Sequence, residues 1–283
     1  MPPLRVFLLT VIALLAFAGN SLLCRVALRQ TAVDPASFTS IRIASAAVVL
    51  WLIALGRRPG GGVQGSWAAA LALFAYAATF SWAYVSLTAA TGALLLFGAV
   101  QATMIGYGWW RGERLRGLQL LGFLIAVGGL VGLLLPGLSA PPVQGALLML
   151  AAGVAWGVYT LRGRGSGDPV RATAGNFIRA LVPAGMLTVA ALSRASLDAP
   201  GVALAVASGA LTSALGYIVW YTALPQLKVS TAATSQLSVP VLAAIGGIVF
   251  LGEAMTLRLV VASTAILGGI ACVVLGGSEP VKD

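Results

Sequence analysis

Two arginines lie inside long apolar runs of this sequence, where a charged side chain is costly. Arg42 and Arg179 each follow an isoleucine, about one to two helical turns into their runs. Such an arginine can bind a carboxylate, or it can hold backbone carbonyls in a purely structural role. The two arginines occupy equivalent positions of a sequence repeat, whereas a substrate is not symmetric, so we expect the structural role.

Aromatic side chains recur on one helical face in the first half of the sequence. Tyr76, Phe80 and Tyr84 are spaced four residues apart, and the repeat maps Phe80 onto Tyr217, beside Trp220. Such faces can line a pocket that stacks an aromatic or aliphatic side chain, since a phenol or indole inside a membrane needs a hydrogen-bond partner. An interfacial belt of aromatic residues is the alternative explanation.

Small polar residues gather before Pro240, which frees a backbone carbonyl inside an apolar run. Thr231, Thr234 and Ser238 share one helical face there. The pattern is equally typical of close helix packing, because small residues let membrane helices approach each other. Together with polar and aromatic residues of other runs, it predicts a substrate pocket lined by Asn20, Phe80, Tyr84, Gln101, Trp156, Tyr159, Tyr217, Trp220, Thr234 and Ser238.

The residues that enzymes use for acid–base or metal chemistry are missing from the apolar runs. The chain has no histidine, and none of its acidic residues lies in the middle of a run. We expect Glu113 and Glu253, each after a glycine at the end of a run, to pair with an arginine or to cap a helix. Cys24 and Cys272 have no metal-ligand spacing and are interpreted as buried thiols. The sequence therefore predicts no catalytic residue, no metal and no cofactor, and not an enzyme.

The composition requires lipid around most of the chain. Of the 283 residues, 59% are hydrophobic and 8% are charged, with a mean hydropathy of +0.99, whereas soluble domains carry about 25% charged residues. Runs of about 20 apolar residues cross a bilayer as helices, because lipid offers no partner to an unpaired backbone amide. We therefore predict an all-α integral membrane protein with ten transmembrane helices, at residues 4–28, 34–55, 66–88, 91–110, 116–135, 144–163, 169–193, 200–224, 229–251 and 257–277.

Two details concern the beginnings of these helices. Asp34-Pro35 and Asp168-Pro169 each place a capping residue before a proline at the first helical position. Residues 1–24, with Arg5 before the apolar Val6–Phe17, resemble a secretory signal, but no small-x-small cleavage site follows cleanly. We interpret them as the first spanning helix.

The basic residues indicate how the chain crosses the membrane. With the N-terminus inside, the cytoplasmic segments hold Arg5, Arg57, Arg58, Arg111, Arg114, Arg116, Arg162, Arg164, Arg171, Lys228 and Lys282. The opposite side holds only Arg25, Arg29, Arg194 and Arg258. This bias predicts cytoplasmic N- and C-termini. Because the basic residues mark helix ends and form no single patch, we expect no nucleic-acid partner despite the net charge of +10.

The two halves of the chain repeat a set of landmarks in one consistent order. Ile41-Arg42, Tyr84, Gly112-Glu113 and Gly128-Gly129 recur as Ile178-Arg179, Tyr221, Gly252-Glu253 and Gly268-Gly269. Each half holds five predicted helices, an odd number, so the second half must enter the membrane inverted. We predict two inverted-topology repeats, residues 1–138 and 139–283, with a substrate site between them and alternating access. The paired glycines are expected to be packing surfaces, within the bundle or in a dimer.

These features resemble the EamA-type members of the drug/metabolite transporter superfamily over residues 4–277. The resemblance rests on the repeated landmarks, on Gly19-Asn20-Ser21 and Trp156-Gly157, and on Leu251-Gly252-Glu253 at the end of the ninth helix. It implies export of amino acids or related small metabolites by a multi-pass protein of a bacterial inner membrane. The tyrosine- and tryptophan-rich central helices look most like the aromatic and neutral amino-acid exporters of that superfamily.

One departure from the small multidrug-resistance relatives bears on mechanism. Those relatives depend on a glutamate in the first helix, whereas this chain has Asn20 there. The absence of this glutamate favours facilitated exchange or uniport over proton-coupled cation exchange. The alternative cargo is a nucleoside, a sugar or a drug-like compound. An intramembrane enzyme would need acid–base residues, which the apolar runs of this chain lack. A purely structural membrane subunit would have no cavity between the halves. The expected partners are a small-molecule substrate and the lipid bilayer, with the protein a monomer or homodimer.

Overall fold

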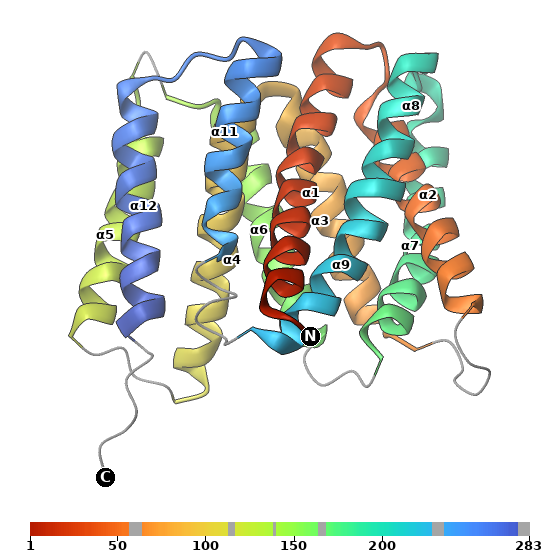
Figure 1. The fold of residues 1–283 in the computed structure, drawn as a ribbon. Coiled ribbons are helices and arrows are strands. Elements are labelled where there is room, and N and C mark those ends of the chain that lie inside the picture. The colour runs from red at the N-terminus through yellow and green to blue at the C-terminus, as the bar shows by residue number, and fades with distance from the viewer. Residues whose placement is uncertain (57–63, 113–116, 138–139, 164–167, 228–234, 277–283) are drawn as a thin grey trace.

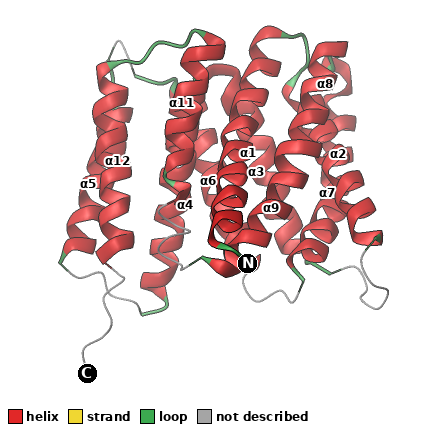
Figure 2. Ribbon diagram, in the orientation of Figure 1, coloured by secondary structure: helices red, strands yellow, loops and turns green. Residues whose placement is uncertain are grey.

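The computed structural model describes residues 1–56, 64–112, 117–137, 140–163, 168–227 and 235–276, and this part of the chain folds into helices without a strand (Figure 1, Figure 2). The long helices are α1 (Pro3–Gln30), α2 (Pro35–Leu55), α3 (Trp67–Ser86), α4 (Ala89–Trp110), α5 (Leu118–Leu134), α6 (Val143–Gly163), α7 (Pro169–Ala191), α11 (Ser238–Leu251) and α12 (Leu257–Gly276). Between α7 and α11 the chain forms η1 (Leu192–Arg194), α8 (Ala199–Ala207), η2 (Ser208–Leu215), α9 (Gly216–Ala223) and η3 (Leu224–Gln226).

The prediction of an all-α membrane protein with ten spans is confirmed. Among the described residues, eight helical segments are long and apolar enough to cross a membrane, one of them the composite Ala199–Gln226. Two shorter apolar helices, α5 and α11, complete the set. Both are shorter than the predicted runs 116–135 and 229–251.

Both predicted Asp-Pro helix starts are confirmed. The Asp34 carboxylate accepts hydrogen bonds from the backbone N–H groups of Ala36 at 2.9 Å and Ser37 at 3.0 Å. Asp168 caps α7 in the same way and accepts from Val170 N–H at 3.0 Å. Each cap satisfies amides that have no partner within their own helix, which fixes where α2 and α7 begin.

The order of the helices gives the two halves of the chain opposite directions. α1 and α6 begin at opposite ends of the bundle, and α12 ends at the end where α1 begins (Figure 1). The end of the bundle where α1 begins is called the near end below, and the other is called the far end.

The span predicted as one regular helix over residues 200–224 is corrected by the structure. It consists of α8, the π-helical segment η2 and α9. A Cβ atom at Gly209 would meet the Ser45 hydroxyl and the Arg42 carbonyl, so glycine lets η2 lie directly against α2. The wider π-helical turn changes which side chains face inward, and such segments are frequent at functional sites.

Several predicted features lie outside the described residues or at their edge. α11 is preceded by Ser235–Leu237 and is capped after Leu251 by Gly252, whose φ of 63° is the left-handed conformation that glycine favours. Thr231 and Thr234 lie outside the described residues, as does Glu113. So do the basic residues Arg57, Arg58, Arg114, Arg116, Arg164, Lys228 and Lys282.

The repeated glycines pack α5 against α12. A Cβ atom at Gly122 would lie 2.5 Å from the Gly269 carbonyl oxygen, and one at Gly129 would lie 2.7 Å from Ala265 Cβ. A Cβ atom at Gly269 would in turn meet the Gly122 carbonyl. At Gly128 and Gly268 it would meet nothing within 4 Å. One glycine of each predicted pair is therefore a packing residue inside the bundle.

Substitution of these glycines tests the packing. Gly269→Val should lower the melting temperature of the detergent-solubilised protein, because overpacking of a tight contact costs about 1–3 kcal/mol. Gly268→Val, its neighbour in sequence, is the matched control and should change the melting temperature little, since its added side chain meets open space. Equal melting temperatures for the two variants would contradict this packing.

Candidate functional site

A cavity of about 620 Å³ lies between the two halves of the bundle. Its wall comes from α1, α3, α4, α6, η2 and α9, with Gln236 just before α11. Gly163, Pro169, Leu224 and Leu227 line it at the near end, where α6 ends and α7 begins. Its volume is within the range of about 300–1,000 Å³ typical of small-molecule sites.

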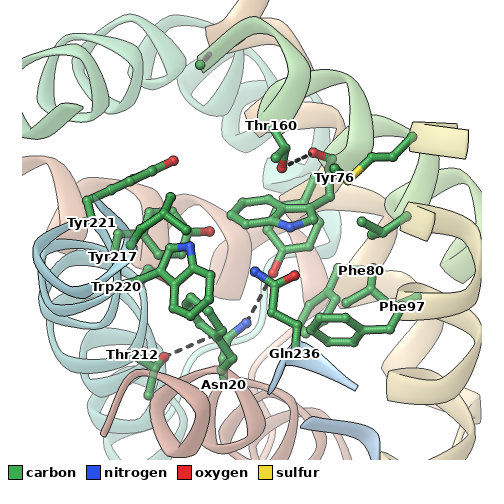
Figure 3. A pocket seen from close by; sticks show the side chains of 18 of the residues that line it. Asn20, Tyr76, Phe80, Phe97, Thr160, Thr212, Tyr217, Trp220, Tyr221 and Gln236 are labelled. Carbon is green, nitrogen blue, oxygen red and sulfur yellow. Dashed lines mark hydrogen bonds between the residues drawn. The ribbon is translucent and has the colours of Figure 1, made fainter. Parts of the chain in front are cut away.

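Aromatic rings form a large part of the cavity wall. The Trp156 ring contacts Tyr76 at 4.9 Å and Tyr217 at 5.2 Å between centroids. Phe17 lies 5.9 Å from Trp220. Figure 3 shows Tyr217 and Trp220 on one side of the cavity and Phe80 and Phe97 on the other. These rings offer flat apolar surfaces against which a side chain of a ligand can stack.

A connected set of uncharged polar groups lies on the same wall. Asn20 Oδ1 accepts hydrogen bonds from the hydroxyls of Ser208 at 2.7 Å and Thr212 at 3.2 Å. Asn20 Nδ2 donates to the Tyr76 hydroxyl at 3.3 Å, so the amide bridges α1, α3 and η2 (Figure 3). Asn20 and Thr212 come to the cavity from opposite halves of the chain. Mutual hydrogen bonds fix the positions of these groups.

Arg42 lies directly behind this polar wall and is 2% exposed. Its Nε donates to Ser213 Oγ at 3.1 Å and its Nη2 donates to the Tyr76 hydroxyl at 3.1 Å. Its guanidinium carbon lies 5.2 Å from the Tyr76 ring centroid and 5.1 Å from that of Phe80. Tyr76, Phe80 and Ser213 all line the cavity, so the positive charge lies one side chain away from it.

The repeat-related Arg179 has the structural role expected from the sequence. Its Nη1 donates to the backbone carbonyls of Gln64 at 2.9 Å and Gly175 at 3.0 Å, which ties α7 to the segment before α3. Arg179 is not among the residues that line the cavity. Arg42 differs from Arg179 in its partners, because it donates to side-chain hydroxyls and not to backbone carbonyls.

The structure brings six of the ten predicted pocket residues to one cavity: Asn20, Phe80, Gln101, Trp156, Tyr217 and Trp220. Tyr84 is fully buried and donates its hydroxyl to the Ala89 carbonyl at 3.4 Å, away from the cavity wall. Tyr159 stacks behind Trp156 at 5.3 Å. Ser238 donates to the Ser235 carbonyl at 2.7 Å and does not line the cavity. Thr234 lies outside the described residues.

Other residues of the wall were not predicted from the sequence. They include Phe17, Ser21, Thr160, Thr212, Ser213, Tyr221 and Gln236, together with Tyr76, which was noted only as part of a stripe. A signal was available for η2, because Ser208, Thr212 and Ser213 are polar residues inside an apolar run. Their common face follows from a π-helical turn, which helical periodicity does not reveal.

An ion pair joins α1 to the segment after α11 at the far end of the bundle. Arg25 Nε donates to Glu253 Oε1 at 3.0 Å, and both side chains are about one-tenth exposed. Arg25 Nη1 donates to the Tyr84 carbonyl at 2.8 Å, while Glu253 Oε2 accepts from Ala89 N–H at the start of α4 at 2.8 Å. The prediction that Glu253 pairs with an arginine or caps a helix is confirmed. We call Arg25 and Glu253 the far-end latch.

A multi-pass bundle with a central aromatic and uncharged polar cavity, reaching one end and latched at the other, has the architecture of a membrane transporter. The sequence pattern of the EamA-like transporter family matches residues 143–275. An uncharacterized protein of Pseudomonas aeruginosa is 59% identical over 274 residues, which are 96% of each chain. This chain belongs to the EamA-like transporter family, within the drug/metabolite transporter superfamily.

Two relatives carry names that state a cargo. The threonine/homoserine exporter RhtA of Salmonella typhimurium is 36% identical over 160 residues, 54% of this chain and 53% of the relative. A protein of Streptantibioticus cattleyicolor named as a probable terminal-alkyne amino-acid exporter is 30% identical over 196 residues, 65% of this chain and 63% of the relative. A solved crystal structure of a protein matches 97% of this chain and 99% of its own with a TM-score of 0.66 and 21% identity, which shows the fold alone.

Thiol labelling tests the accessibility of the cavity. In a protein with Cys24→Ala and Cys272→Ala, a cysteine at Thr160→Cys should react readily with a small hydrophilic thiol reagent, because Thr160 lines the cavity. Ser81→Cys is the matched control, since Ser81 is fully buried on α3 and does not line the cavity. Equal labelling rates at the two positions would show that the cavity is not accessible as described.

Proposed function

We propose that this protein exports amino acids with neutral or aromatic side chains, and related small metabolites, across a bacterial inner membrane. The observation that carries the proposal is the cavity itself, where an aromatic wall lies beside hydrogen-bonding groups from both halves. None of the described residues that line it is charged. A wall of this kind suits an uncharged side chain of moderate size.

The names of two relatives support this choice of cargo. Both are described as exporters of amino acids, and in both comparisons the matched region is only part of each chain. Threonine and homoserine are small and polar, whereas a terminal-alkyne side chain is apolar. The mixed wall of Asn20, Thr212, Trp156 and Trp220 has surfaces for either kind.

We further propose that transport proceeds by alternating access between two inverted repeats, residues 1–138 and 139–283. The packing of the helices supports this, because α2 packs against its counterpart α7, and α5 packs against its counterpart α12. α3 packs against α6, and in the corresponding way η2 and α9 pack against α1. With both termini in the cytoplasm, as the basic residues predict, the cavity reaches the cytoplasmic side. An exporter loads its cargo from that side.

Flux through proteoliposomes tests the function. Vesicles that contain the purified protein should take up one or more labelled neutral amino acids, and excess unlabelled substrate should suppress the signal. A panel of the twenty amino acids with one nucleoside, one sugar and one cationic dye separates the proposed cargo from the alternative metabolites. Flux of the nucleoside, the sugar or the dye without flux of any amino acid would remove the amino-acid assignment.

The aromatic wall should contribute to substrate affinity. Trp156→Ala should raise the KM for transport by about two- to tenfold, since one aromatic contact is worth about 0.5–1.5 kcal/mol. Trp51→Ala is the matched control, because Trp51 is 50% exposed on the outer surface of α2 and lies away from the cavity. An unchanged KM in Trp156→Ala would contradict a substrate site at this wall.

Opening of the far end should require rupture of the far-end latch. In sealed vesicles, an impermeant thiol reagent added on the far side should reach Ser21→Cys only when that end opens. Glu253→Gln should raise this labelling rate about ten- to a hundredfold, because a hydrogen bond to a charged group is worth about 1.5–3 kcal/mol. Asp198→Asn at the same end of the bundle is the control, since Asp198 caps α8 and should leave the rate unchanged. No increase in Glu253→Gln would exclude the latch as the closing contact.

A further inference from the structure

The positive charge of Arg42 has no counter-ion in the described part of the chain. The acidic side chains that the structure describes are engaged elsewhere: Asp34, Asp168 and Asp198 cap helices, and Glu253 pairs with Arg25. A buried charge normally has an opposite charge as partner, because desolvation of an unpaired ion is costly. At 2% exposure, Arg42 receives compensation only from hydroxyl oxygens and aromatic rings.

One nitrogen of this guanidinium is also without a hydrogen bond. Among the described buried side-chain atoms, Arg42 Nη1 is the one that has no partner. An arginine presents five N–H groups in a planar fork, which matches the two oxygens of a carboxylate. An unused edge of that fork inside the membrane points to an acceptor that the protein itself does not supply.

The neighbours of Arg42 are donors as well. The Tyr76 hydroxyl oxygen accepts from both Asn20 Nδ2 and Arg42 Nη2, and Ser213 Oγ accepts from Arg42 Nε. Within the described residues, neither hydroxyl has an acceptor of its own at hydrogen-bond distance. Three donors therefore gather in one region: the O–H groups of Tyr76 and Ser213 on the cavity wall, and the buried Nη1 edge of Arg42 directly behind them. A site rich in donors and poor in acceptors recognises an anion.

We propose that Arg42, with Tyr76 and Ser213, forms the subsite that receives the carboxylate of the transported molecule. The inference rests on the proposed function in that it takes the central cavity as the place where cargo binds. The cargo is thereby specified as a carboxylic acid, with its side chain on the aromatic wall. The positive charge behind Tyr76 and Phe80 attracts the carboxylate, while the two hydroxyls turn to donate to it.

The comparison between Arg42 and Arg179 provides the control. Both follow isoleucine at equivalent positions of the repeat, but Arg179 donates to two backbone carbonyls and is only partly buried. Arg179 lies away from the cavity wall. Its substitution removes the same charge from the same type of helix without a change in the donor site.

Calorimetric titration of the purified full-length protein with phenylacetate and with phenylacetamide tests the subsite. These two probes have the same ring and differ in the presence of a charged carboxylate. The wild type should bind phenylacetate about tenfold or more tightly than the amide, as expected for a charge-assisted contact. Arg42→Gln should lose this preference through weaker phenylacetate binding, whereas Arg179→Gln should keep it.

A second variant guards against misfolding of Arg42→Gln. Tyr76→Phe keeps the ring and the arginine and removes a single hydroxyl, and it should reduce the preference for phenylacetate several-fold while the affinity for phenylacetamide changes little. Equal binding of the two probes by the wild type would overturn the proposal. So would a full preference retained in both Arg42→Gln and Tyr76→Phe, or an absence of phenylacetate binding in a protein that transports amino acids.

These results separate the subsite from the proposed function. Amino-acid flux in a protein that binds acid and amide equally would leave the exporter and remove the carboxylate subsite. A preference for phenylacetate that depends on Arg42, in a protein that moves no amino acid, would establish the subsite and remove amino-acid export as the function.

Discussion

Lipid supplies no hydrogen bonds, so each polar group that this chain places between the helix ends must find its partner within the protein. The side chains of α1, α2, α3 and η2 meet this requirement jointly, except at Arg42 Nη1. Asn20 Oδ1 accepts hydrogen bonds from Ser208 and Thr212, and Asn20 Nδ2 donates to the Tyr76 hydroxyl. The same hydroxyl accepts a hydrogen bond from Arg42. Separation of α1 or α2 from α3 or η2 would leave buried donors or acceptors unpaired. The cavity therefore has one firmly positioned wall, built from both halves of the chain.

The same constraint has different consequences for the two repeat-related arginines. Arg179 lies close enough to backbone carbonyls to use them, so its contribution is structural. Arg42 faces η2, where the π-helical turn presents Ser213 and where Gly209 removes the side chain that would separate the two segments. Two arginines at matching positions of the sequence pattern thus have different surroundings, because Arg42 packs against a distorted helix. Sequence symmetry is not a guide to symmetry of role here.

Most of the fold could be predicted from hydropathy and helix-capping rules, because spans and helix starts depend on local sequence. Asp34-Pro35 and Asp168-Pro169 are examples where two residues determine a boundary. The wall of the cavity was predicted only in part. Trp156 and Tyr217 were found from aromatic spacing, but Tyr84 satisfies the same spacing and is covered by Gly92 of α4. Contacts between distant helices decide which aromatic residue faces the cavity, and no periodicity within one helix encodes them.

The far-end latch and the cavity share an element, and this connects closure with binding. Glu253 caps the first turn of α4 through Ala89 N–H, while Gln101 and Phe97 of the same helix line the cavity. Arg25 belongs to α1, which also carries Asn20 and Phe17. Rupture of the ion pair would therefore free the end of α1 from Glu253, which also holds the first turn of α4. A ligand that draws α1 and α4 into new positions changes the geometry of the latch, since each helix is a stiff rod between its two functional contacts. Under the proposed alternating access, α1 and α4 would themselves connect the cavity with the far-end latch, because each helix has contacts at both places.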